Sequence, residues 1–310
     1  MNYELSEDQA GILGGLEQLI GSLNIEVPKD AAFSAYSQRL DDELTAGGFL
    51  AVTEKEGFSL LDGALVVEAL AQLPVSVEAA TSILVAPLVL EDAPHPVAIV
   101  SGAATAPARF LPMAKVLLVD TGTDLLRYDL PDGAVESVET LFAYPYGRLK
   151  SADGIKPISL GADQITGFRR RWRIAIAVEA AGLMQSALTQ VLEHVKTRQQ
   201  FGRPIGSFQA VQHRLVIAAE VGQSTKWLAF RAAWSDSESD AAIAAAYAQD
   251  CIPKFANDLH QFCGAMGLTL EFPLHHFTYR LRALLGELGG SSAQALAVAD
   301  SVYAKQAPIL

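Results

Sequence analysis

The sequence predicts a protein that is mainly α with a small β-domain. Apolar residues recur every three or four positions before residue 92 and after residue 159, which is the spacing of amphipathic helices. Between them lie short apolar runs separated by turn residues, which is typical of strands. The chain has 310 residues, half of them apolar, so its length suits two or three structural units. We expect a helical domain over 1–92, a β-domain over 93–158 and a helical bundle over 159–310.

The first domain is expected to hold several helices. Leu, Val and Ala recur at helical spacing from Ser6 to about Glu91, with an interruption around Gly57. The acidic run 41–43 fits a turn that faces solvent.

The middle domain is expected to hold short strands at 97–100, 115–119 and 125–129. Residues 131–133, Pro-Asp-Gly, predict a turn after the last of these runs.

The third domain starts with a long predicted helix. Its apolar residues lie on one stripe: Ile174, Ala177, Val178, Ala181, Met184, Leu188, Val191, Leu192 and Val195. The acidic loop 235–240 separates two further helices, and Pro253 is expected to kink one of them or mark its restart. The run 289–292, Gly-Gly-Ser-Ser, precedes a final helix.

Composition excludes several classes of function. A formal net charge of -12 disfavours nucleic acid, whose phosphates are bound by clustered Lys and Arg. The two cysteines lie in an alanine-rich helical region, which predicts neither a disulfide nor a zinc site. The pair His275-His276 lacks suitably spaced further ligands, so no metal is expected. Without a leader pattern or about 18 consecutive apolar residues, we expect no membrane span and a cytoplasmic location.

The segment 198–209 combines cationic, aromatic, turn-forming and amide residues between two predicted helices. Gly202 and Pro204 stop the first helix, and helical spacing resumes at Phe208. Arg198 and Gln209 therefore flank a tight turn that is expected to hold their head groups near one another. An arginine placed there can bind a phosphate through its planar fork.

This corner, through Arg198, Phe201, Gly202, Ile205 and Gln209, resembles the Arg-x-x-Phe-Gly-x-x-Ile/Leu-x-x-x-x-Gln pattern of the acyl-CoA dehydrogenase family. The segment 261–273 is similar to the family's Gln-x-x-Gly-Gly-x-Gly-(Phe/Tyr)-x-x-Glu pattern, and 5–9 and 43–50 resemble further landmarks. The resemblance implies an N-terminal helical domain, a middle β-domain and a C-terminal four-helix bundle.

The resemblance also implies FAD as cofactor and the α,β-dehydrogenation of an acyl-CoA thioester. In that reaction a carboxylate base removes the α-proton and the flavin accepts a hydride. Arg198 would neutralise the FAD pyrophosphate, and Phe201 and Gln209 would line its ADP half. Gln261 and Gly264 would present backbone nearby. Family members lend these contacts to a flavin seated mainly on the neighbouring subunit.

The catalytic glutamate of the family is missing from both of its usual positions. The commonest position matches Gly289, and the alternative one, on the long helix, matches Trp172. The family's Thr-Glu-Pro-x-Ala-Gly-Ser-Asp segment is also replaced, by residues 101–107. The chain therefore resembles the short non-catalytic subunit of α2β2 steroid side-chain acyl-CoA dehydrogenases. This implies a heterotetramer in which the partner subunit brings the base, with an electron-transfer flavoprotein-type acceptor.

Two other functions stay open. One is a homo-oligomeric acyl-CoA dehydrogenase that uses an unrecognised carboxylate, Glu179 or Glu287. The other is a catalytically dead assembly scaffold. Arg169, Arg170, Arg171 and Arg173 form a basic run, which we interpret as a solvated helix start or a subunit contact, with a site for CoA phosphates as the alternative.

Overall fold

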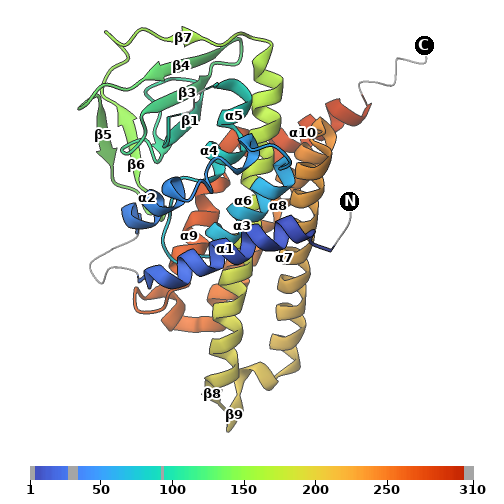
Figure 1. Cartoon of the computed structure of the whole chain (residues 1–310). Helices are drawn as coiled ribbons and strands as arrows, with labels where there is room; N and C mark the ends of the chain where they lie inside the picture. The colour runs from blue at the N-terminus through green and yellow to red at the C-terminus, as the bar shows by residue number, and fades with distance from the viewer. Residues whose placement is uncertain (1–3, 27–33, 92–93, 304–310) are drawn as a thin grey trace.

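The computed structural model describes residues 4–26, 34–91 and 94–303. The expected boundary between the first two domains, at 92/93, lies outside these residues, and the domain limits stay predictions. The fold class is confirmed, because helices precede and follow a small β region along the chain. Strands β1–β7 gather at one end of the molecule, and a long helix runs from them to the opposite tip (Figure 1).

The N-terminal part begins with a capped helix. The Ser6 hydroxyl accepts a hydrogen bond from the Gln9 amide N–H, and the Gln9 side chain accepts one from the Ser6 N–H. The helices of this part are α1 (Glu7–Leu23), α2 (Gln38–Ala46), η1 (Val52–Glu54), α3 (Leu60–Ala71), α4 (Ala80–Leu84) and α5 (Ala86–Val89).

The interpretation of 41–43 as a solvent-facing turn is wrong in part. These residues lie inside α2, and Asp41 is only 3% exposed, whereas Asp42 and Glu43 do face solvent. A buried carboxylate needs a partner, and His95 donates to it or shares its proton at 2.7 Å.

The β region consists of two small sheets. One has the order β1-β3-β4-β7, with β1 and β3 parallel and the other pairs antiparallel; the other has the order β2-β6-β5. The three predicted strands and the turn at 131–133 are confirmed. The strands are β1 (Val97–Ser101), β2 (Ala108–Arg109), β3 (Val116–Asp120), β4 (Leu125–Asp129), β5 (Val135–Val138), β6 (Tyr146–Leu149) and β7 (Ile158–Ser159).

Helix α6 (Gln164–Thr197) forms the centre of the C-terminal part. Every residue from 172 to 184 is buried, so the predicted single stripe is too narrow: neighbouring helices cover α6 on all sides there. Helix α3 approaches so closely at Gly182 that a Cβ would lie 2.3 Å from the Glu68 carbonyl oxygen. Helix α6 is long and apolar enough to span a membrane, but 78% of its apolar window is buried inside the protein, as in core helices.

The remaining elements follow α6 in order. They are β8 (Gln199–Gln200), β9 (Arg203–Pro204), η2 (Ile205–Ser207), α7 (Gln209–Ser235), α8 (Glu238–Cys263), η3 (Gly264–Leu268), α9 (His275–Leu284), η4 (Glu287–Gly289) and α10 (Gly290–Tyr303). The predicted loop near 235–240 is shorter than expected, and α8 continues through Pro253 without a restart.

Candidate functional site

The corner at 198–209 is a hairpin set between two helices. Arg198 is the C-cap of α6, and its amide N–H donates to the His194 carbonyl at 2.9 Å. Gln199 and Gln200 then pair with Pro204 and Arg203. The turn residues Phe201 and Gly202 have φ values of 55° and 78°, which a two-residue hairpin turn requires. The hairpin therefore forms the tip at which α6 ends and α7 begins (Figure 1).

The side chains at this tip face solvent. Phe201 is 90% exposed, and Arg198 and Gln209 are exposed as well. Within the described residues, the Arg198 guanidinium forms no hydrogen bond or ion pair. The Phe201 ring lies edge-on to Phe208 at 6.1 Å, and the Arg203 guanidinium lies over Phe208 at 4.0 Å. A large exposed aromatic beside an unpaired cation is typical of a surface that another molecule covers.

The second predicted segment lies at the same end of the bundle. Gln261 is in the last turn of α8 and Gly264 follows as its C-cap, and both are exposed. They line a cavity of about 520 Å3 together with His260 and Tyr279. Gly264 has φ 58° and ψ -142°, a conformation that favours glycine.

Helix packing brings this segment and the corner to one end. Arg214, one turn beyond Gln209 in α7, pairs with Asp258 in α8 and lies over the Phe262 ring at 5.0 Å. His194, in the last turn of α6, contacts the Phe272 ring at 5.3 Å. Among the described residues, however, no hydrogen bond or ion pair joins the hairpin directly to Gln261 or Gly264. The two predicted segments are thus neighbouring exposed surfaces rather than one closed site.

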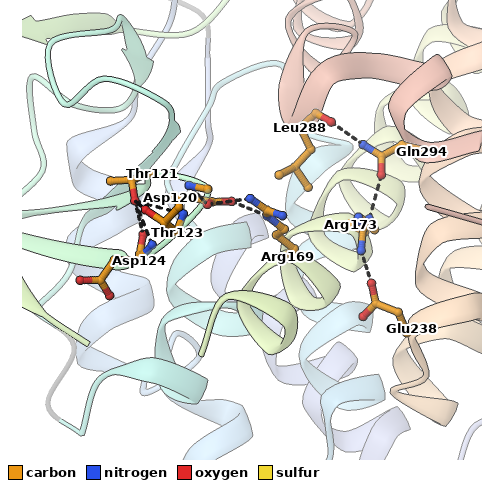
Figure 2. Close-up of polar contacts among 10 residues, drawn as sticks. Asp120, Thr121, Thr123, Asp124, Arg169, Arg173, Glu238, Leu288 and Gln294 are labelled. Carbon is orange, nitrogen blue, oxygen red and sulfur yellow. Dashed lines mark hydrogen bonds and ion pairs between the residues drawn. The ribbon is translucent and has the colours of Figure 1, made fainter. Parts of the chain in front are cut away.

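The arginines at the start of α6 form ion pairs with acidic residues of the same chain. Arg169 pairs with Asp120 of β3 at 2.5 Å, and Arg173 pairs with Glu238 of α8 and donates to the Gln294 side chain at 2.8 Å (Figure 2). Arg170 and Arg171 both pair with Asp236, at 2.8 and 2.9 Å. These ion pairs connect α6 to the β region, to the end of α7 and to α8. The expectation of a solvated helix start holds only in part, since Arg173 is buried while the other three arginines stay partly exposed. The subunit contact and the site for CoA phosphates stay predictions.

The turn at 287–290 carries the position that matches the family's base. Leu288, Gly289 and Gly290 have φ values of 50°, 80° and 73°. Gln294 donates to the Leu288 carbonyl at 3.0 Å (Figure 2). Gln249 donates to the Glu287 carbonyl at 3.0 Å. A Cβ at Gly289 would lie 2.8 Å from the Ala293 Cβ. The turn therefore selects against a side chain at 289, in addition to lacking a carboxylate there.

Beside this turn lies a buried cluster of charges, which we call the Arg109 cluster and which comprises Arg109, Tyr144, Glu179 and Glu287. The Arg109 Nη1 donates to both Glu179 oxygens, at 2.9 and 3.1 Å, and its Nε lies 2.5 Å from Glu287. The Tyr144 hydroxyl donates to Glu179 at 2.5 Å. Strand β2, helix α6 and turn η4 thus meet through one guanidinium.

Trp172 and Arg280 complete the surroundings of this cluster. The Trp172 indole N–H donates to Glu287 at 2.6 Å. Arg280 is 3% exposed and donates to the carbonyls of Ala71, Leu73 and Val75, at the end of α3. Its guanidinium also lies 5.8 Å from the Tyr144 ring centroid.

Burial and neighbouring charges together raise the pKa values of Arg109, Tyr144 and Glu287. Burial lowers the pKa of Arg109, but the charges of Glu179 and Glu287 outweigh it and raise that pKa well above its ordinary value. Burial raises the pKa of Glu287 despite Arg109 and Trp172. Burial also raises the pKa of the Tyr144 hydroxyl, which keeps it a hydrogen-bond donor to Glu179.

Sequence patterns single out Glu179 and Glu287 but not Arg109 or Tyr144. Both of these lie in the β region, more than thirty residues from Glu179, and no local motif marks them. A larger cavity, of about 1110 Å3, lies elsewhere, between α2 and the β region, and His95 and Asp41 line it. In the described part of the chain, no group of three or more His, Cys, Asp or Glu side chains is arranged to hold a metal ion.

Comparison with known proteins gives a partial match in sequence. Residues 161–303 match the model of the acyl-CoA dehydrogenase C-terminal domain. The acyl-CoA dehydrogenase FadE34 of Mycobacterium tuberculosis (strain ATCC 25618 / H37Rv) is 32% identical over 185 residues, which cover 56% of this chain and 24% of that protein. The match thus spans about a quarter of the length of this relative.

The likeness in structure extends over nearly the whole chain. The Tcur3481-Tcur3483 steroid ACAD G363A variant superposes with a TM-score of 0.78 at 20% identity, covering 97% of this chain and 99% of that chain. The ChsE4-ChsE5 complex from Mycobacterium tuberculosis superposes with a TM-score of 0.74 at 18% identity, covering 99% and 100%. The chain thus contains a region that matches the acyl-CoA dehydrogenase C-terminal domain, and it shares the fold of these two structures along nearly its whole length.

Proposed function

We propose that this chain is the non-catalytic subunit of a hetero-oligomeric, FAD-dependent acyl-CoA dehydrogenase. In this proposal it supplies contacts to the ADP half of a flavin, and a related partner subunit supplies the base and the site of the flavin ring. The observation that carries the proposal is an exposed, unpaired corner on a chain whose own base positions hold Gly289 and Trp172.

The residues at the tip fit the ADP half of FAD. The exposed Arg198 guanidinium offers paired N–H donors, which match the oxygens of a pyrophosphate. The exposed Phe201 ring offers an apolar surface, and Gln209 and Gln261 offer amide donors and acceptors. Gly264 leaves open space where a Cβ would stand. Bound FAD would supply the hydride acceptor, while these side chains would neutralise and orient its phosphates.

The interior of the chain does not fit the catalytic half of the reaction. A base must present a free carboxylate oxygen to the α-proton of the thioester. Both oxygens of Glu179 accept hydrogen bonds from Arg109, and one also accepts from Tyr144. Glu287 is held by Arg109 and Trp172. The homo-oligomeric alternative therefore lacks support at either carboxylate.

Two similar structures guide the proposed substrate and assembly. One is named as a steroid ACAD and the other as a two-component complex. We therefore assign a steroid side-chain acyl-CoA as the substrate class, an α2β2 heterotetramer as the assembly and an electron-transfer flavoprotein-type acceptor. The proposed location is the cytoplasm.

Co-expression tests this function. The full chain would be produced alone and together with candidate catalytic acyl-CoA dehydrogenase subunits from the same organism, and the mass and flavin absorbance of each purified species would be measured. We expect flavin and a mixed tetramer only after co-expression. A homo-oligomer that carries flavin when produced alone would overturn the proposal, and a mixed tetramer without flavin would favour the scaffold alternative.

A further inference from the structure

Both positions that match the family's base meet at the Arg109 cluster. Trp172 bonds directly to Glu287, and Gly289 lies two residues beyond Glu287 in the same turn. The region in which a base would face an acyl thioester is therefore adjacent to the Arg109 guanidinium. The side chains of Arg109, Glu179 and Glu287 are each at most 13% exposed.

Several elements hold the Arg109 cluster in place and cover it. Its cation and two carboxylates come from different elements, β2, α6 and η4. The ring of Tyr144 covers the Arg109 guanidinium at 4.7 Å, and Phe110 packs on Tyr144 at 5.3 Å. The buried Arg280 guanidinium lies 5.8 Å from the Tyr144 ring centroid and donates to backbone carbonyls.

An acyl group cannot share this space with the cluster. A buried charge is tolerated only while it is paired, so an alkyl or steroid group that separated Arg109 from its carboxylates would leave costly unpaired charges. A thioester carbonyl would also need free hydrogen-bond donors. The Nη1 and Nε groups of Arg109 already serve Glu179 and Glu287.

We propose that Arg109, clamped by Glu179 and Glu287, occupies the acyl-thioester position of this chain and closes it to substrate. This inference rests on the proposed function, since it would leave one acyl-CoA site for each pair of subunits. It extends that function by naming the side chain that closes the second position.

Two triple variants that remove all three charges of the cluster test this closure in the co-expressed complex. Arg109→Gly with Glu179→Gln and Glu287→Gln removes the guanidinium while the amides keep acceptors for Tyr144 and Trp172. Arg109→Met with the same two changes keeps the space filled without charge. Equilibrium dialysis with radiolabelled octanoyl-CoA counts thioester sites, and free CoA separates acyl binding from nucleotide binding.

We expect the Gly variant to gain one octanoyl-CoA site per copy of this chain, and the Met variant to match the wild type. An assembled Gly variant that gains no site would overturn the proposal, as would a wild-type complex that binds more than one thioester per pair of chains. If the Gly triple variant does not assemble, Arg109→Ala with Glu179→Gln and Glu287→Gln replaces it, because this variant also removes the guanidinium and leaves no unpaired buried charge.

Flavin absorbance of the same samples separates the two proposals. If this chain bound flavin without its partner, the proposed function alone would be overturned. A changed number of thioester sites at constant flavin content would bear only on the closure by Arg109.

Discussion

The Trp172 indole N–H donates to the Glu287 carboxylate at 2.6 Å and so joins the long helix α6 to the turn η4. These two elements carry the alternative locations of the catalytic glutamate in the family that this chain resembles. In this protein a tryptophan stands at one location and Gly289 at the other. The carboxylate between them is engaged in internal contacts.

Removing the guanidinium of the cluster should destabilise the fold. Arg109→Ala leaves Glu179 and Glu287 buried without their cation, which costs about 3–5 kcal/mol of unfolding free energy. Urea denaturation of the full chain or its complex measures the change. The control is Arg148→Ala, whose side chain is 55% exposed in its pair with Glu136 and should cost less than about 1 kcal/mol. Equal losses in both variants would contradict the assignment of a structural ion pair at Arg109.

Restoring a glutamate at the commonest base position should not create an active subunit. Gly289→Glu places a side chain at φ 80°, which costs about 1–2 kcal/mol for an L-residue, and its Cβ would crowd Ala293. We expect a lower midpoint of urea unfolding and no dehydrogenation of acyl-CoA by the chain alone. The matched control is Gly286→Ala, where φ is -90° and no atom lies within 4 Å of a Cβ. Activity in Gly289→Glu would show that the cluster leaves room for a substrate.

Truncation of the exposed corner should weaken flavin binding without affecting the fold. Arg198→Ala removes a cation that forms no ion pair among the described residues, so the unfolding free energy should stay within about 0.5 kcal/mol. In the co-expressed complex we expect at least a tenfold rise in the FAD dissociation constant, about 1.4 kcal/mol. Arg127→Ala, on β4, is the control and should keep wild-type affinity. Unchanged FAD affinity in Arg198→Ala would favour the scaffold alternative.

Protonation of His95 should make stability depend on pH. The imidazole lies between Asp41 at 2.7 Å and Glu78 at 3.7 Å, with the Ser82 hydroxyl at 2.8 Å. Burial and the charge of Lys115 lower the pKa of His95, but the hydrogen bond to Asp41 and the carboxylate charges raise it overall above 6.5. Because the folded-state pKa is the higher one, this stabilisation is full below about pH 6.5 and is lost as pH rises through the folded-state pKa.

The measurement is the unfolding free energy at several pH values from 5.5 to 9. His95→Gln should flatten the decline relative to the wild type, whereas His213→Gln, at an exposed position on α7, should not. The quantity compared is the difference in unfolding free energy between the wild type and His95→Gln. If this difference grew as the pH rose from 5.5 to 9, His95 would not be the charged partner of Asp41.

Local patterns were sufficient to predict the succession of elements. The helical periodicity of α6, the strand runs that became β1, β3 and β4, and the breaks at Gly202 and Gly289 are all visible along the chain. They are local signals, because backbone preferences and turn chemistry act over a few residues. The same locality explains why these patterns do not reveal the burial of Asp41, since its partner His95 lies 54 residues away.

The sequence by itself determined the order of helices and strands, the tight turn of the Arg198 corner and the absence of a glutamate at residues 172 and 289. Only the tertiary structure decided that the arginines at the start of α6 form ion pairs within the chain, and that Arg109 lies between Glu179 and Glu287. These contacts join residues 49 to 178 positions apart, and no spacing rule predicts which distant carboxylate a buried guanidinium will meet. Burial selects those partners, since a charge removed from water must find its counter-charge wherever the fold places it.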